Sequence, residues 1–392
     1  MGVGDTSGLR KHGRVALVHD FLLSLRGGER VFLALCDLFP DATVYSPVYN
    51  EDGTEGRFSA RGVTTSYLQN LRPSSSNFRG LLPFYPRAVE SLDMSEFDLI
   101  ISSSSAWSHG VIAHEGQRHV CYSHNPFRYA WDQRLDATRG RPLPVRKALE
   151  RILGRWRSWD RAVAREVDVY VANGEITRER LARSFGRSSS VLHPPVDVGR
   201  FRTGHAGERF VVLSELMPHK RIDVIVQACS QMGVPLTVMG DGPDLRRLRS
   251  LAGDTVEFTG RVADSEVAER LSGCAALIQC ATEEFGIASV EAQASGRPVL
   301  ALAAGGALET VMPGQSGALF ASADVETMVS ALGSFDPGSF DPAACRASAE
   351  RFSKGAFAVG LAKAVDSLDG VPMAPRERQS VRRRGLWRPA TA

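Results

Sequence analysis

The chain has 392 residues, of which 43% are hydrophobic and 23% are charged, a composition typical of a globular protein large enough for two domains. Its formal net charge of +3 is too small to indicate nucleic acid as a partner. No apolar run reaches the roughly 20 residues that span a bilayer, and the polar first residues lack the apolar core of a signal peptide, so we expect a cytoplasmic protein.

The first half of the chain predicts alternating strands and helices. Residues 14–19 (RVALVH) form a short β-branched run typical of a buried strand, and a glycine-containing loop, SLRGGER, precedes a predicted helix over 30–39. The stretches FDLIISSSS, HVCYSHN and VDVYVAN predict three further buried strands that end in polar residues. Strands that alternate with helices favour a parallel sheet with helices on both faces.

The same alternation restarts after a turn-rich stretch at residues 195–208, which we interpret as a linker. Five further strands are predicted at RFVVLSEL, VPLTVMGDG, VEFTG, AALIQCA and RPVLALAAGG. The predicted fold is therefore α/β, with two Rossmann-like domains facing a central cleft and ligands at the carboxyl ends of the strands. Its parts are an N-terminal domain over 1–200, completed by a helix at about 354–370, a second domain over 201–353, and a basic, disordered tail over 371–392.

Two carboxylates flank a glycine in the stretch CATEEFGIASVEAQASG. Gly286 lies near the start of a short predicted helix, whose N–H groups and dipole favour an anion such as a diphosphate. Glu291, about one turn further on, suits the two vicinal hydroxyls of a ribose, because a carboxylate only accepts hydrogen bonds. Glu283, before the turn, is placed to meet the groups that the diphosphate carries. The alternative is that Glu291 pairs locally and that Glu283 is a solvated loop acid.

Lys220 and Arg221 lie between a predicted strand and a predicted helix in HKRID. Acids beside a diphosphate need cations nearby, which this pair is placed to supply. A solvated basic turn is the alternative. The glycines of VMGDGPDL indicate a tight turn, because Leu245 stands where a dinucleotide-binding GxGxxG motif has its third glycine.

Candidate ligand contacts in the first half are weaker. Gly27 and Gly28 either cradle an anion or sugar at a helix start or form an ordinary turn. His124 ends a predicted strand, where it either donates to a substrate hydroxyl or is structural. The series His109, His114, His119 and His124 predicts no metal site, because steps of five residues do not align on a strand or helix face.

Residues 145–165 predict a basic amphipathic helix with apolar positions at helical spacing. The simpler interpretation places its apolar stripe in the core and its basic face in solvent. The alternative is docking on an anionic membrane surface, for which the Arg-rich tail with Trp387 is a second candidate.

Together these motifs resemble a known family. Glu283 and Glu291, separated by seven residues, the intervening EFGI, the downstream EAQASGRPV and GGALET, and the upstream HKRID and GDGP resemble the family 4 retaining nucleotide-sugar glycosyltransferases, which have the two-domain GT-B fold. The similarity covers roughly residues 14–368. In the first half, VHDFLLSLRGGERV, CYSHNPFRYAWD and VLHPPVDVGRF resemble the branch of polysaccharide and O-antigen mannosyltransferases.

The resemblance implies a role for each matching position. Glu291 is implied to bind the donor ribose, and Lys220 to neutralise the donor diphosphate. Glu283 and His124 are implied to contact the donor sugar as the catalytic residues. Further donor contacts are implied at Gly27, Gly28, Arg221, Gly260, Arg261, Val262, Phe285, Gly286 and Ile287.

The implied activity is transfer of a sugar, most directly mannose from GDP-mannose, to a hydroxyl of a glycan or polyprenyl-linked lipid acceptor, without a metal or another cofactor. Two alternatives stay open: another enzyme of this fold, such as a sugar-nucleotide epimerase or a phosphorylase, and a non-catalytic sugar-nucleotide binding protein.

One residue departs from the family pattern. Glu215 stands where the family usually has an arginine, so diphosphate binding is expected to be weaker unless Arg221 or another cation substitutes.

Overall fold

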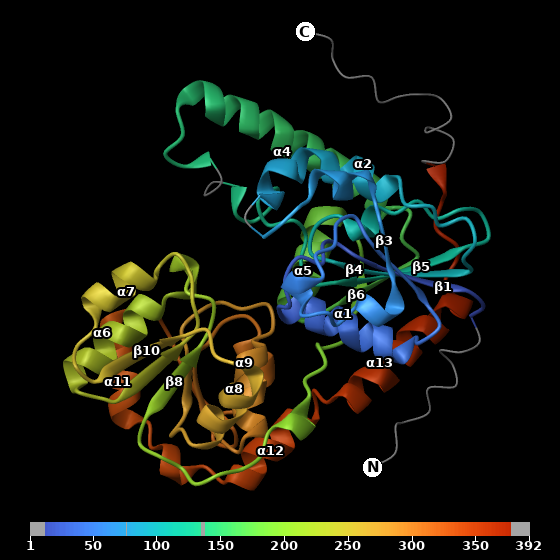
Figure 1. The fold of residues 1–392 in the computed structure, drawn as a ribbon. Helices are drawn as coiled ribbons and strands as arrows, with labels where there is room; N and C mark the ends of the chain where they lie inside the picture. Colours follow the sequence, from blue (N-terminus) through green and yellow to red (C-terminus); the bar gives the residue numbers. More distant parts are fainter. Residues whose placement is uncertain (1–11, 76, 135–137, 378–392) are drawn as a thin grey trace. The chain divides into compact units, whose positions relative to one another are not determined.

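The structure, a computed structural model, describes residues 12–75, 77–134 and 138–377. They form two compact units, each built on one parallel sheet (Figure 1). This architecture confirms the predicted α/β class with two Rossmann-like domains. The N-terminal unit contains the described residues up to 173, together with 177–192 and those from 358 on, and the second unit contains 174–176 and 193–357.

The N-terminal unit is built on a seven-stranded parallel sheet in the order β3-β2-β1-β4-β5-β6-β7. Parallel strands that are covered on both faces of the sheet need apolar side chains on both faces. The longer strands therefore lack the alternation of polar and apolar residues that a half-exposed strand shows. The register pairs His19 with Ser103 and Ser104 with Ser123, so the polar strand ends of β1, β4 and β5 lie side by side. The strands are β1 (Val15–His19), β2 (Thr43–Ser46), β3 (Val63–Thr65), β4 (Leu99–Ser104), β5 (Arg118–Ser123), β6 (Val169–Ala172) and β7 (Ser189–Val191).

The helices of the N-terminal unit supply two apolar clusters. Trp107 lies in the larger cluster with Tyr85 of α2 and Val163 of α4, while Leu181 of α5 packs in the smaller one with Tyr170. None of the described helices is both long enough and apolar enough to cross a membrane. The helices are α1 (Gly27–Leu38), α2 (Tyr85–Glu90), α4 (Leu143–Ala164), α5 (Glu175–Phe185) and α13 (Lys354–Asp366), of which α5 and α13 have their first residues in the second unit.

The second unit is built on a six-stranded parallel sheet in the order β10-β9-β8-β11-β12-β13. Helices α6, α7 and α11 cover one face and α8, α9 and α12 the other (Figure 1). The strands are β8 (Phe210–Leu213), β9 (Leu236–Met239), β10 (Val256–Gly260), β11 (Leu277–Gln279), β12 (Val299–Leu302) and β13 (Gly317–Phe320). The helices are α6 (Ile222–Met232), α7 (Leu245–Leu251), α8 (Asp264–Ser272), α9 (Ile287–Ala294), α10 (Ala307–Thr310), α11 (Val325–Ser334) and α12 (Pro342–Glu350).

The segment interpreted above as a linker, 195–208, lies within the second unit, where the Val196 N–H donates to the Phe352 carbonyl over 2.8 Å. The C-terminal tail also differs from the prediction. Residues 371–377, part of the tail for which the sequence predicts disorder, lie against the N-terminal unit. Arg376 pairs with the buried carboxylate of Asp168 at 2.8 Å, because a buried carboxylate needs a cationic partner. The remainder, 378–392, with the tail's membrane candidate at Trp387, lies outside the described residues.

Candidate functional site

Each sheet has one point at which the strand order reverses, between β1 and β4 in the N-terminal unit and between β8 and β11 in the second. At such a point the connections leave on opposite faces, and the carboxyl ends of the strands are the usual place for a ligand. Gly27 and Gly28 follow β1 at this point. In the second unit Lys220 follows β8 and Glu283 follows β11.

Lys220 and Glu283 form an ion pair at the reversal point of the second sheet. Lys220 ends the short 3-10 helix η8 (Pro218–Lys220), and its Nζ lies 2.6 Å from both carboxylate oxygens of Glu283. The two side chains are 19% and 21% exposed, so Glu283 is not the solvated loop acid of the alternative interpretation. The structure thus brings a predicted cation and a predicted acid into contact.

The glycine turn after Glu283 is held in place by Gly306, in the loop after β12. Gly286, at φ +89°, precedes the first residue of α9, Ile287, and a positive φ is a conformation that glycine adopts readily. The Gly306 N–H donates to the Glu283 carbonyl over 2.9 Å, and a Cβ at Gly306 would overlap the backbone of Phe285. Two loops therefore pack backbone to backbone here, and they fix where Glu283 leaves the chain.

Glu291 lies on α9 and is paired with Arg200, a residue that the sequence analysis missed. Arg200 Nη2 donates to Glu291 Oε1 over 3.0 Å, and Nη1 donates to Asp264 over 2.9 Å. Glu291 is therefore paired, but not with a partner nearby in the sequence as in the alternative interpretation. Arg200 and Glu291 are 91 positions apart, so no local pattern indicates the contact.

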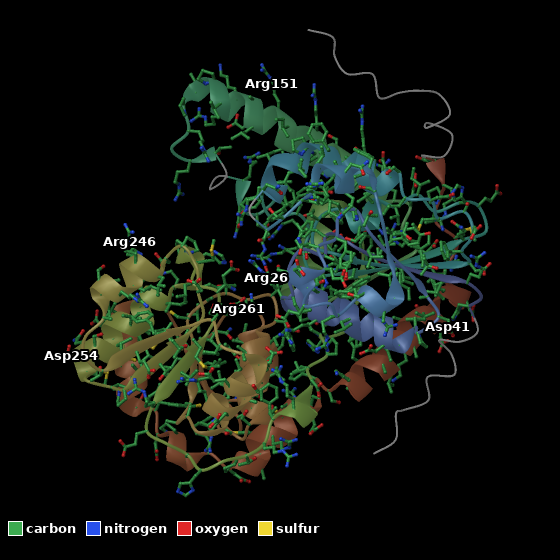
Figure 2. All side chains as sticks on the ribbon, in the orientation of Figure 1. Arg26, Asp41, Arg151, Arg246, Asp254 and Arg261 are labelled. Atoms are coloured by element: carbon green, nitrogen blue, oxygen red, sulfur yellow. The ribbon has the colours of Figure 1, made fainter. Side chains whose placement is uncertain are left out.

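The other predicted donor contacts of the second unit lie on the same edge of the sheet. Gly260 ends β10 at φ +72°, and its carbonyl accepts the Gly240 N–H over 2.9 Å. Val262 packs against the core and Arg261 is exposed (labelled in Figure 2); in the sheet order β10 is separated from β11 by β9 and β8. Arg221, at φ +52°, lies 3.5 Å from Asp223.

In the N-terminal unit the structure brings His124 and Gly28 together with a second histidine. His124 Nε2 lies 2.8 Å from Ser103 Oγ, which lies 3.1 Å from His19 Nδ1. A Cβ at Gly28 would lie 3.8 Å from the His19 ring and 3.9 Å from His124 Nε2. Burial lowers the pKa of His19 to about 3, so its ring is neutral near neutral pH. Neither His19 nor Ser103 is a candidate contact that the sequence alone indicates.

Glu29 fixes the start of α1, on which Gly27 and Gly28 are the first two residues. Its carboxylate accepts the Arg26 N–H over 3.1 Å, a capping contact at the helix N-terminus. Burial raises the pKa of Glu29 to about 7, against the smaller lowering effect of the backbone hydrogen bonds. The glycine turn is thus held by a carboxyl group that titrates near neutral pH.

Two other histidines of the spaced series, His109 and His119, have separate structural contacts. His109 lies 2.9 Å from the Tyr170 hydroxyl and 3.3 Å from Asp160, and His119 lies 2.8 Å from Ser102. Within the ranges that the structure covers, no three His, Cys, Asp or Glu side chains are grouped to hold a metal ion.

Family models match both halves of the chain. The model "Glycosyltransferase Family 4" matches residues 25–200, and "Glycosyl transferases group 1" matches residues 200–336. The two matches meet at the start of the second unit and together contain each site residue predicted above.

Curated relatives match less than half of this chain. A GDP-mannose-dependent alpha-(1-6)-phosphatidylinositol monomannoside mannosyltransferase of Mycobacterium tuberculosis is 34% identical over an alignment of 209 positions that covers 45% of this chain and 54% of the relative. A D-inositol 3-phosphate glycosyltransferase of Nocardioides sp. is 30% identical over an alignment of 212 positions that covers 43% of this chain and 46% of the relative. The chain therefore spans about half the length of the curated relatives it matches.

Solved structures match over nearly the whole fold. Anabaena HepE, solved with UDP and glucose, has a TM-score of 0.68 at 17% identity and covers 90% of this chain and 100% of its own. Sucrose-phosphate synthase from Thermosynechococcus elongatus has a TM-score of 0.67 at 16% identity. The match covers 91% of this chain and 99% of the synthase chain. At such identities the likeness shows the fold alone, which is the predicted GT-B fold. With both family models matched in sequence order on this fold, the chain belongs to the family 4 glycosyltransferases.

Proposed function

We propose that the protein transfers mannose from GDP-mannose to a hydroxyl group of a glycolipid or another glycan acceptor, with retention at the anomeric carbon. The observation that carries this proposal is the Lys220–Glu283 ion pair, at the strand reversal and beside the start of α9. The Mycobacterium tuberculosis relative supports the donor and acceptor class, since it uses GDP-mannose and acts on a phosphatidylinositol mannoside.

Donor binding exchanges the partner of Lys220. Its ammonium group leaves the Glu283 oxygens for the diphosphate, whose charge also interacts with the N–H groups at Gly286 and Ile287. Glu283 then accepts hydrogen bonds from the mannose hydroxyls, and Glu291, oriented by Arg200, accepts from the ribose. Gly260, Arg261 and Val262 contact the nucleobase, and Arg221 supplies the second positive charge that Glu215 does not.

In the transfer step the bond between the anomeric carbon and the diphosphate oxygen breaks, and negative charge develops on that oxygen. Lys220 and the start of α9 stabilise this charge, which lowers the barrier. The acceptor oxygen forms the new bond on the same face of the sugar and passes its proton to the departing phosphate oxygen. His124 hydrogen-bonds the transferred sugar, and Gly27 and Gly28 border it. The products are GDP and a mannoside.

The test is to incubate the full chain with a panel of GDP and UDP sugars, with and without a lipid-linked acceptor. We expect GDP-mannose to raise the melting temperature most, through ligand linkage, and to release GDP with a mannosylated product. Isomerisation of the sugar nucleotide without GDP release would support an epimerase. Consumption of donor only with inorganic phosphate would support a phosphorylase. A thermal shift without turnover, with acceptor present, would support a binding protein.

We propose further that the first turns of α4 contact an anionic membrane surface that carries the acceptor. The C-terminal half of the predicted apolar stripe matches the simpler interpretation, since Val163 lies in the core and Trp156 packs against it. Leu143 and Val145, in contrast, are 55% and 45% exposed, beside exposed basic residues such as Arg151, whose side chain projects from α4 in Figure 2. Exposed apolar side chains within a basic face have the chemistry of a lipid-surface contact.

Flotation with vesicles of neutral lipid alone, and of neutral plus anionic lipid, tests this contact. Binding is expected only with anionic lipid, to weaken with salt, and to be lost in Leu143→Ser/Val145→Ser. Arg246→Ser on α7 of the second unit is the charge control and should bind as the unmodified protein does. Binding that is equal on neutral vesicles would contradict the proposal.

A further inference from the structure

Glu309, on the short helix α10 of the second unit, binds two partners and has no part in the proposed function. Its Oε2 lies 2.7 Å from Nε2 of His193, and its Oε1 accepts the backbone N–H of Glu175 over 2.9 Å. A carboxylate accepts hydrogen bonds and does not donate them, so the histidine ring is the donor in the first contact. The Glu309 side chain is only 12% exposed, so these two donors take the place of most of its water.

The ring of His193 packs against two phenylalanine rings. Its centroid lies 5.5 Å from that of Phe285 and 5.1 Å from that of Phe352, and the two phenylalanine centroids are 5.1 Å apart. Both phenylalanines are buried, and aromatic rings at these distances are in direct contact. Phe285 lies between Glu283 and Gly286 in the sequence. The position of the His193 ring therefore bears on the loop that carries the candidate carboxylate and the glycine turn.

A second connection runs through the backbone of α10. The Glu309 N–H donates to the Gly306 carbonyl over 3.1 Å, and the Gly306 N–H donates to the Glu283 carbonyl over 2.9 Å. Glu309 is thus joined to the Glu283 loop in two ways, through the His193 and Phe285 rings and through the start of its own helix.

We propose that Glu309 and His193 are positioning residues for sugar transfer, and that their hydrogen bond fixes the loop that presents Glu283 and the N–H groups at Gly286 and Ile287. This inference rests on the proposed function, in which those groups contact the sugar and the diphosphate. Without the hydrogen bond the ring and α10 are held less firmly, so the reacting groups spend less time in their productive geometry.

The N-terminal unit contains a matched histidine–carboxylate pair outside the candidate site. Nε2 of His109 lies 3.3 Å from Oδ1 of Asp160, and Oδ2 of Asp160 accepts the Trp131 Nε1–H over 2.7 Å. The His109 ring also stacks on an aromatic side chain, Phe185, with 5.4 Å between centroids. His109→Phe therefore removes a comparable contact and is the control for a loss of stability alone.

Hydrogen–deuterium exchange of the full chain, measured on peptides by mass spectrometry, is the first readout because it needs no substrate. His193→Phe keeps an aromatic ring and removes the N–H donor, and Glu309→Ala removes the acceptor. We expect both variants to exchange severalfold faster in peptides that cover 281–290 and 303–311, where the Ser289 and Gly306 amides are hydrogen-bonded. His109→Phe should leave exchange in these peptides unchanged.

Steady-state kinetics below the melting transition are the second readout. We expect kcat for sugar transfer to fall roughly tenfold in His193→Phe and in Glu309→Ala, with KM for the acceptor within about twofold. The double variant should lose no more than Glu309→Ala alone, because that change already removes the contact. His109→Phe should keep kcat and both KM values within about twofold, since a loss of stability alone does not alter the folded molecules.

Unchanged exchange in both single variants, or a kcat within about twofold of the unmodified protein, would overturn the inference. An equal fall of kcat in His109→Phe would overturn it as well, because stability alone would then account for the loss. If exchange changes as expected but no nucleotide sugar is turned over by the unmodified protein, the inference about the loop holds and the proposed function fails.

Discussion

The strand ends of the two units carry different polar chemistry. In the second unit the side chains are charged and partly exposed, as in Lys220–Glu283 and Arg200–Glu291. In the N-terminal unit His19 and Ser103 are buried and neutral, and they are joined to His124 by hydrogen bonds. A charged side chain can exchange one ionic partner for another, whereas leaving a buried polar group unpaired costs about 1–3 kcal/mol. One region is therefore suited to exchanging partners with an arriving anion, and the other to keeping its geometry.

The largest effect on activity is expected at Glu283, in the charged region. Glu283→Ala is expected to lower kcat for transfer by roughly a thousandfold, because it removes the carboxylate proposed to contact the sugar at the reacting carbon. The variant should keep its fold, since Glu283 is not part of the apolar core, and a cooperative melting transition checks this.

Glu266→Ala is the matched control, because Glu266 also pairs with a cation, Arg270, at 2.8 Å in the same unit. It should retain full activity. A fully active Glu283→Ala variant would overturn the assignment of this residue.

Lys220 is expected to have the next largest effect. Lys220→Met should lower kcat/KM by about a hundredfold, because charge on the departing diphosphate is no longer neutralised. Lys220→Arg should recover only part of the lost kcat/KM, since a guanidinium group has a different geometry from an ammonium group. Initial rates over a range of donor concentrations check both variants, and equal kcat/KM values for Met and Arg at this position would contradict a charge role.

The neutral network predicts a pH dependence of stability. The pKa of His19 falls from 6.5 in the unfolded chain to about 3 in the folded state, so the unfolded state binds the extra proton between these values. The contribution of His19 to stability should therefore fall as the pH is lowered from 6.5, by about 2 kcal/mol at pH ~5. Denaturant midpoints over this range should fall more steeply, or rise less, in the unmodified protein than in His19→Asn.

Glu29 has the opposite effect on the pH dependence of stability and serves as an internal control. Its pKa is raised from 4.5 to about 7, so the folded state binds the extra proton and stability falls as the pH rises through this window. Because the two effects offset each other between about pH 5 and pH 7, Glu29→Gln should expose the loss of stability that His19 causes on the acid side. Parallel pH profiles for His19→Asn and the unmodified protein would show that the His19 ring does not stay neutral.

The smallest effect is expected at the second ion pair. Glu291→Ala should raise KM for the donor about tenfold with kcat within about twofold, because ribose contacts are made before and during transfer alike. Arg200→Met should act similarly if it orients Glu291, and the double variant should lose no more than either single one. Additive losses would show that Arg200 and Glu291 act independently.

The repeated element pattern could be predicted from the sequence because buried parallel strands are short apolar runs. The predictions found β1, β4, β5 and β6, and β8 to β12, but no prediction was made for β2, β3, β7 or β13. The segments TVYS, VTT and SSV are short and rich in hydroxyl side chains, so only pairing with a neighbouring strand identifies them as strands.

The candidate site was predictable where its residues lie in loops directly after predicted strands. Gly286, Glu283 and Lys220 lie next to strand ends and helix starts, which are local signals. Arg200 meets Glu291 across 91 positions and His19 meets Ser103 across 84, and such pairs exist only once the sheets are formed. Glu215 was noticed as a departure from the family pattern, and the structure places it, exposed, in the loop that also carries Lys220.

The C-terminal residues return to the N-terminal unit, and this affects the order in which the two units can fold during synthesis. Helix α13 enters that unit at residue 358, and Arg376 then joins the chain to Asp168. Strands β1 to β7 thus leave the ribosome long before the helix and the arginine that complete their unit. The second unit has all its residues by Phe357, so it is the first able to finish folding, although it is encoded later. The N-terminal unit must wait, with part of its apolar surface uncovered, for residues 358–377 to be made.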